Sequence, residues 1–197
     1  MQNIDSFIEQ INKGLDSFKL DDLPSIDLYM DQVTTLLNEK MILSGRESDD
    51  KSITKTMINN YCKSKLLPSP EKKKYSKDHL ILLSMINFYK NIISINDTHT
   101  LLKEVTDNYF HNEETPVLDV ANEILNVTKK LSSSDDLINL QEKCLKECSF
   151  ENYEDSEYLQ TLSFITVLSY QAYVRQQLII RMIDRLNEET DDKSEKK

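Results

Sequence analysis

The chain has 197 residues and a formal net charge of −10, and 39% of its residues are hydrophobic. Its 2 glycines and 4 prolines are too few for a sandwich with many tight turns or for glycine-rich loops that cradle phosphates. Leu, Ile, Lys, Glu, Asp and Asn dominate, and this composition is typical of helices joined by polar turns. We therefore expect an all-α fold.

The first half of the chain is predicted to form helices that end at polar or proline-containing turns. Apolar residues at spacings of three and four predict an amphipathic helix over residues 3–18. A second helix is expected to run to about Leu43, with Ser25 or Asp27 as its N-cap. A third is expected over residues 53–67, and the run Leu67-Pro68-Ser69-Pro70 ends it because proline cannot continue the hydrogen-bond ladder.

Two capped helices are predicted to follow a short extended link at residues 71–75. Ser76 is a suitable N-cap for a strongly apolar helix over residues 77–93. Ser94 is predicted to cap the next helix, which runs to about Phe110.

The second half of the chain predicts three more helices. Pro116 suits the first position of a helix that runs to Leu131. Another is expected over residues 134–148, and a long one over residues 156–189, followed by a polar tail.

The sequence indicates neither a targeting segment nor a membrane span. Its start is amphipathic and acidic, without the basic region and apolar run of a signal peptide. The longest apolar candidate, residues 158–174, is uncharged but rich in Ser, Thr and Gln. The 3 cysteines have no spacing typical of a disulfide framework. We expect a cytoplasmic protein with no membrane partner.

Positive charge is concentrated in the middle of this acidic chain. Residues 51–90 hold nine lysines against Glu71 and Asp78, a net charge of +7, whereas residues 1–50 carry −7 and residues 91–197 carry −10. Such an asymmetry suggests an anionic partner for the central region.

The predicted helix at 53–67 has an outer face that is rich in hydrogen-bond donors. Met57, Ile58 and Tyr61 are expected to pack inward, which leaves the polar residues of this stretch outside. Asn pairs with adenine, Thr contacts the thymine methyl group, and Lys reaches guanine or phosphate. The outer residues that we expect to face a DNA groove are Lys55, Thr56, Asn59, Asn60 and Lys63.

The loop after this helix contains three adjacent ammonium groups, which suit phosphate contacts beside a groove. Its predicted DNA-binding residues are Lys72, Lys73, Lys74 and Tyr75. The competing interpretation is that a lysine-rich amphipathic helix is simply a solvated face. Both interpretations remain open from the residues alone.

A wider pattern resembles the DNA-binding head of MerR-type regulators. The residues that carry the resemblance are Ile53-Thr54, Ile58, Tyr61, Leu66-Leu67-Pro68, Tyr75-Ser76, Leu80, Leu83, Ile86, Ser94 and Leu101-Leu102. The whole chain also resembles a bacterial family known only as a domain of unknown function. The resemblance implies a winged helix-turn-helix, with residues 53–67 as recognition helix and 68–75 as a truncated wing, and dimers on promoter DNA. Asn59-Asn60-Tyr61-Cys62 replaces the usual Arg-Tyr-Tyr-Glu, and the wing lacks the usual arginines and glycine.

Other residues offer weaker candidates for chemistry. Cys144 and Cys148 share a helical face and offer two thiolate ligands or a redox pair, but a zinc site needs about four ligands. His111 with Glu113 and Glu114 is interpreted as a polar connector between helices. No nucleotide-binding, hydrolase or metalloprotease motif occurs. We therefore expect no catalytic residue, no metal site and no cofactor.

These observations predict an N-terminal helix and linker at 1–24, a MerR-like DNA-binding domain at 25–110, a helical C-terminal module at 111–190 and a polar tail at 191–197. The predicted function is a transcription regulator that binds double-stranded DNA as a homodimer through its C-terminal helices, with an effector that the sequence does not name. The long last helix is equally consistent with packing inside one subunit. The alternative function is a helical adaptor whose basic region docks an acidic protein.

Overall fold

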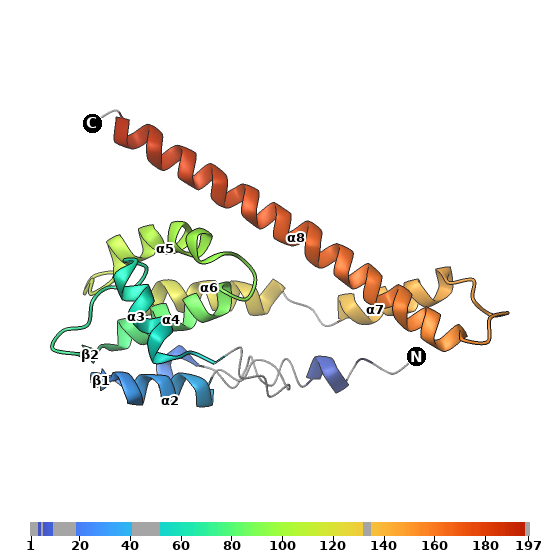
Figure 1. The fold of residues 1–197 in the computed structure, drawn as a ribbon, viewed down its shortest axis with the longest axis horizontal. Helices are drawn as coiled ribbons and strands as arrows, with labels where there is room; N and C mark the ends of the chain where they lie inside the picture. The colour runs from blue at the N-terminus through green and yellow to red at the C-terminus, as the bar shows by residue number, and fades with distance from the viewer. Residues whose placement is uncertain (1–3, 5, 10–18, 41–51, 132–134, 196–197) are drawn as a thin grey trace.

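The computed structural model describes residues 4, 6–9, 19–40, 52–131 and 135–195, and these are mostly helical, as the all-α expectation requires (Figure 1). The elements in chain order are the 3-10 helix η1 (Leu20–Asp22), β1 (Leu28–Tyr29), α2 (Met30–Lys40), α3 (Lys55–Lys63), β2 (Lys74–Tyr75), α4 (Lys77–Tyr89), α5 (Ile95–Tyr109), α6 (Val117–Leu131), α7 (Asp135–Glu147) and α8 (Ser156–Glu195). No described helix is both long enough and apolar enough to cross a bilayer.

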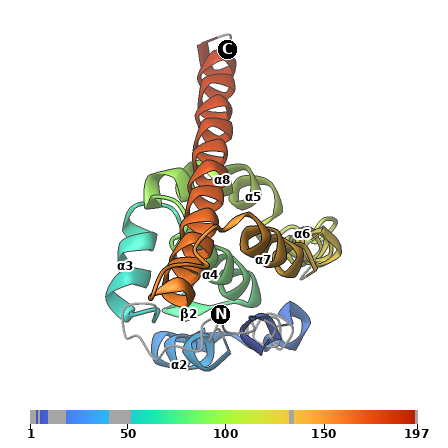
Figure 2. The ribbon, with the colours of Figure 1, turned by 90° about the vertical axis from the view of Figure 1, so that its right-hand side faces the viewer.

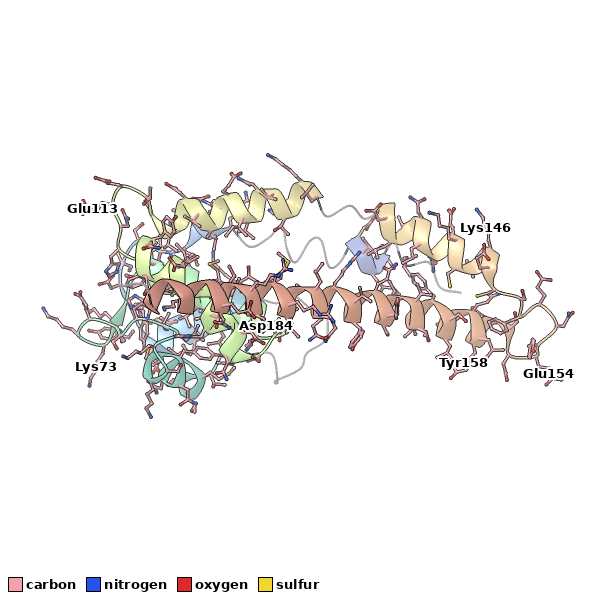
Figure 3. All side chains as sticks on the ribbon, turned by 90° about the horizontal axis from the view of Figure 1, so that it is seen from above. Lys73, Glu113, Lys146, Glu154, Tyr158 and Asp184 are labelled. Carbon is pink, nitrogen blue, oxygen red and sulfur yellow. The ribbon has the colours of Figure 1, made fainter. Side chains whose placement is uncertain are left out.

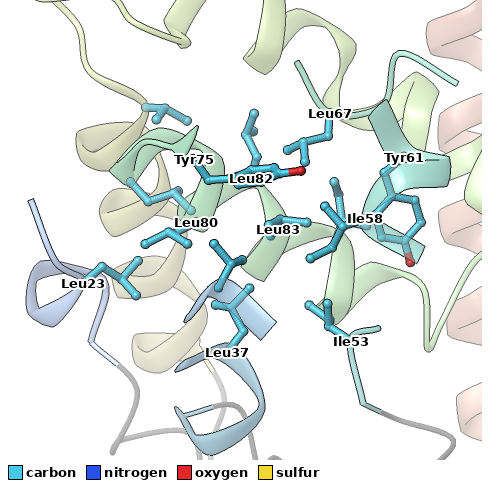
Figure 4. Packing of buried hydrophobic residues seen from close by; sticks show 14 of the residues in the cluster. Leu23, Leu37, Ile53, Ile58, Tyr61, Leu67, Tyr75, Leu80, Leu82 and Leu83 are labelled. Atoms are coloured by element: carbon cyan, nitrogen blue, oxygen red, sulfur yellow. The ribbon is translucent and has the colours of Figure 1, made fainter. Parts of the chain in front are cut away.

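A single apolar core joins the elements of the first half. Helix α4 lies at its centre, because nearly every turn of this helix is apolar on all sides and must be covered. Leu37 of α2, Ile58 of α3 and Leu83 of α4 are fully buried against one another (Figure 4). We call the unit formed by residues 19–40 and 52–110 the head. Val117 and Ala121 of α6 belong to the same core, so the start of α6 packs against the head rather than away from it.

The predicted caps are confirmed in part. Ser94 caps α5 by accepting the Asp97 N–H, and Ser76 occupies the N-cap of α4. Neither Ser25 nor Asp27 caps the second helix, which begins only at Met30. The Gln32 side chain accepts the Tyr29 N–H there, so the cap is supplied from inside the helix. The predicted helix at 3–18 is described only at residue 4 and at residues 6–9, and the loop at 44–50 lies outside the described residues.

A small antiparallel sheet, which the all-α expectation did not include, joins residues far apart in the sequence. Leu28 pairs with Tyr75 and Tyr29 pairs with Lys74. This pairing ties the segment before α2 to the segment after α3, so the two helices and the basic loop form one unit.

The C-terminal half is open and elongated. Helix α8 begins beside α7 and passes over α5 before it ends near the far edge of the head (Figure 1). In Figure 2, α8 runs up the picture, with α3 on one side of it and α6 and α7 on the other. Gln176 anchors α8 to the head by donating a 2.6 Å hydrogen bond to the Ile92 carbonyl, and Ile183 is buried.

Candidate nucleic-acid interface

Helix α3 lies within the predicted range of 53–67 but is shorter at both ends, since it runs from Lys55 to Lys63. Thr54 starts the helix by accepting the Met57 N–H at 3.2 Å. Ile58 and Tyr61 are buried, and Met57 is half-buried. The five residues predicted to face outward are all exposed: Lys55, Thr56, Asn59, Asn60 and Lys63. The helical period therefore places one donor-rich face in solvent, as the sequence predicted.

A side-chain clamp holds the start of α3 against α2. The Asn38 amide donates to the Ile53 carbonyl at 3.0 Å and accepts the Ile53 N–H at 2.8 Å. Both backbone groups of a buried residue are thereby satisfied by one side chain from the preceding helix. The clamp fixes the position of α3 relative to α2. The only indication of this clamp in the sequence is a polar residue near the end of α2.

The basic loop is a tight β-hairpin that projects from the head, and Lys73 lies at its outer end (Figure 3). The Lys74 N–H donates to the Glu71 carbonyl at 2.8 Å, and these two residues also form a bridge. Lys72 and Lys73 fill the two central positions with φ of 48° and 67°. Positive φ at both positions is the pattern of a type I′ turn, which favours Asn and Gly.

A third lysine with a left-handed backbone follows α3. Lys65 has φ of 60° at the place where helices usually end in glycine. Of the described non-glycine residues with positive φ, three are lysines of this region and the fourth is His111. A left-handed conformation costs an L-residue other than glycine about 1–2 kcal/mol. The chain therefore has ammonium groups at positions where the backbone favours glycine.

The exposed lysines of this region lie on α3, in the turn after it and in the hairpin. They are Lys55, Lys63, Lys65, Lys72, Lys73 and Lys74. Lys55 forms an ion pair with Asp31 of α2, and Lys74 lies 5.6 Å from the centre of the Tyr29 ring. Within the part of the chain that the structure describes, Lys63, Lys65, Lys72 and Lys73 form no ion pair. These four side chains remain available to an anion.

Tyr75 differs from the other predicted contacts, because its side chain is only 2% exposed. It packs in the core beneath the hairpin and contacts Cys62 of α3. Burial, and then the neighbouring Cys62, raise the pKa of Tyr75 to about 12. The prediction that Tyr75 contacts DNA is therefore corrected: the residue supports the hairpin from inside. The prediction failed because Tyr75 follows three exposed lysines in the sequence and was assigned to the same surface.

Residues 18–124 match the model of a domain of unknown function, DUF1836. The chain belongs to the DUF1836 family. No curated protein and no solved structure matches the chain. The basic helix and hairpin lie wholly inside the DUF1836 segment, whereas α7 and α8 lie outside it. The exposed lysine face is thus part of the DUF1836 unit and not of the C-terminal extension.

The other candidate residues of this DUF1836 protein lie elsewhere. Cys144 of α7 and Cys148, which directly follows this helix, are half-buried. Burial is the largest cause that raises the pKa of Cys144, followed by Cys148 itself. A raised pKa reduces the thiolate fraction that metal binding and redox chemistry use. Among the described residues, no group of three or more His, Cys, Asp or Glu side chains is placed to hold a metal ion. His111 packs instead against the start of α4.

Proposed function

We propose that this DUF1836 protein is a DNA-binding transcription regulator of MerR-like, winged helix-turn-helix type. In this proposal α3 enters the major groove, where Thr56, Asn59 and Asn60 contact base edges. The hairpin at 71–74 contacts the neighbouring phosphates, together with Lys63 and Lys65. The observation that carries the proposal is the placement of lysines at three left-handed backbone positions around one exposed, donor-rich helix.

The packing of the head supports this assignment. The Asn38 clamp and the β1–β2 pairing hold α2, α3 and the hairpin in one fixed arrangement. A reading head needs such rigidity, because base contacts are short and directional. A merely solvated face would need neither a strained turn nor a clamp. Lys63, Lys65, Lys72 and Lys73, which form no ion pair with any described residue, add charge where DNA phosphates would lie.

We also propose that the protein acts as a homodimer through α8. Large apolar side chains remain exposed along this helix: Tyr158, Leu162, Ile165, Tyr170, Tyr173, Val174, Leu178 and Met182. Glu154 and Asp155 precede its uncharged stretch, and Arg175, Arg181 and Arg185 follow it. An antiparallel second copy would bring the acidic end of one helix beside the arginines of the other, whereas a parallel copy would juxtapose like charges. The two-fold symmetry would repeat the reading helix on the DNA.

The test is selection of a labelled pool of random DNA duplexes at low and at moderate salt. We expect an enriched sequence with wild type and a loss of sequence preference with Asn59→Ala/Asn60→Ala. The Lys72→Asn/Lys73→Gly variant should keep the turn and the preference but lose affinity. Its salt dependence should be shallower by roughly two in the slope of log affinity against log salt, because two phosphate contacts are gone.

The matched control is Lys143→Gln/Lys146→Gln, which removes the same charge from α7, at the opposite end of the molecule from Lys73 (Figure 3). It should bind DNA like wild type. If a folded protein binds no duplex even at low salt, or if the control loses as much affinity as the hairpin variant, the proposal fails. The basic face would then be a docking surface for an acidic protein.

A further inference from the structure

The strongest unexplained feature lies where the hairpin meets α4. His79 is 1% exposed, although its ring can carry a charge. Its Nδ1 atom accepts the Ser76 N–H at 3.1 Å and lies 2.8 Å from Ser76 Oγ. A backbone N–H can only donate, so Nδ1 must be the unprotonated nitrogen of a neutral ring. His79 thus occupies the capping-box position that Glu or Gln usually fills.

A second histidine reaches the same serine from the turn between α5 and α6. His111 Nε2 lies 3.1 Å from Ser76 Oγ, and the His111 N–H donates to the Asp78 carboxylate at 2.8 Å. His111 has a φ of 55°. Among the described non-glycine residues, it is the one with a positive φ that lies outside the basic region. Ser76 is therefore the joint between three parts: the strand β2, the start of α4 and the α5–α6 turn.

The surroundings of the His79 ring disfavour a positive charge. Tyr75 of β2 and Phe110 of the α5–α6 turn contact the ring edge-on, with ring centroids 5.5 Å and 4.8 Å away. His79 Nε2 is buried, and no described residue lies at both the distance and the angle of a hydrogen bond to it. The charged or titratable groups that face the ring are Asp78 on its own helix, His111 and Tyr75.

We propose that His79 is a pH-sensitive latch between the basic hairpin and the rest of the head. When Nδ1 takes up a proton, it can no longer accept the Ser76 N–H, and two donors face each other. The capping box at α4 opens because the Ser76 N–H has lost its acceptor. A charged ring is also unfavourable between Tyr75 and Phe110, so the contacts that hold Ser76, His79 and the α5–α6 turn together loosen. The hairpin and the α5–α6 turn then move independently of each other.

The sign of the pH effect follows from the same surroundings. Burial lowers the pKa of His79 most, and the nearby His111 lowers it further, while the Ser69 carbonyl, Asp78 and the Pro68 carbonyl act in the opposite direction. A histidine whose pKa is lower in the folded state stabilises that state above the unfolded value of about 6.5. The latch is therefore closed at neutral pH and opens as the pH falls below that value.

The test compares amide hydrogen exchange at pH 7.5 and pH 5.5, expressed as protection factors that remove the intrinsic effect of pH. In wild type, protection at the Ser76 and His111 amides should fall by up to roughly tenfold, since one pH unit below the unfolded-state pKa is a factor of ten. His79→Gln keeps an acceptor for the Ser76 N–H but cannot titrate, so its protection should be independent of pH.

Two further variants separate the latch from other causes. His99→Gln removes an imidazole from α5 and should behave as wild type does. His111→Asn keeps a residue that tolerates positive φ, and it should reduce the response because the pKa of His79 is then less depressed. The proposal is overturned if wild-type protection is flat or if His79→Gln responds to pH like wild type. If His79→Gln fails to fold, ring NMR of wild type decides: titration of His79 without amide changes also overturns it.

A consequence for DNA rests on the function proposed above. Affinity for the selected duplex should fall between pH 7.5 and pH 5.5 in wild type and stay constant in His79→Gln. Exchange that opens without any duplex binding would refute DNA binding and leave the latch intact. Duplex binding together with hydrogen exchange that does not depend on pH would refute the latch and leave DNA binding intact.

Discussion

At the scale of single residues, lysine is a poor choice for the tip of this hairpin. Lys72 and Lys73 have positive φ, where Asn and Gly are favoured. We expect Lys72→Asn/Lys73→Gly to raise the free energy of unfolding by about 1 kcal/mol, because backbone strain is relieved. Urea unfolding measures this. The same variant should lose DNA affinity, so stability and binding change in opposite directions. A less stable variant would mean that the lysines do not strain the turn.

Asn38 is the second residue with a specific cost. Asn38→Ala removes both hydrogen bonds to the Ile53 backbone and leaves two buried polar groups without a partner. We expect the free energy of unfolding to fall by about 1–3 kcal/mol. Asn59→Ala makes the same chemical change at an exposed position of α3 and should stay within about 0.5 kcal/mol of wild type. Equal effects of the two substitutions in urea unfolding would show that the clamp contributes nothing.

At the scale of elements, the hairpin depends on a neutral Tyr75. Its pKa of about 12 in the folded protein exceeds the ordinary value of 10.0, so the unfolded chain loses this proton first as the pH rises. Stability should therefore fall as the pH rises above 10, and Tyr61 and Tyr89, whose pKa values burial also raises, add to the loss. Tyr75→Phe should make the fall shallower by up to about 1.4 kcal/mol per pH unit. Urea unfolding between pH 8 and pH 11 checks this, and an unchanged slope would contradict it.

Local periodicity made α3 predictable, and long-range pairing left β1 unpredictable. The spacing of Ile58 and Tyr61 alone decides which side of α3 is buried, so its exposed polar face could be predicted. The two residues of β1 carry no periodic signal, and their partners lie more than forty positions away. The Asn38 clamp and the contact between His111 and Ser76 were missed for the same reason: each joins parts of the chain whose proximity only the fold creates. Tyr75 was misplaced because charge in neighbouring residues is no guide to the burial of one ring.

At the scale of the whole molecule, the open C-terminal half predicts self-association. Glu154→Lys/Asp155→Lys should weaken the dimer about tenfold, because like charges then meet at each end of an antiparallel pair. Arg181→Glu/Arg185→Glu should weaken it similarly, and combining the four changes should restore much of the affinity. Analytical ultracentrifugation over a range of protein concentrations measures the dissociation constant. A monomeric wild type, or a combined variant weaker than either pair, would contradict the antiparallel arrangement.

Helix α8 is also held at two buried positions along its length. Phe164 is buried in the part of the helix beside α7, and Ile183 is buried in the part beside α5. Each residue of an α-helix turns by about 100°, so the phase between these two anchors depends on how many residues separate them. Inserting one residue between them would rotate one of the two side chains out of its buried position. Inserting seven residues would restore the phase to within about 20°. The length of α8 between its anchors is therefore constrained by angle more tightly than by distance.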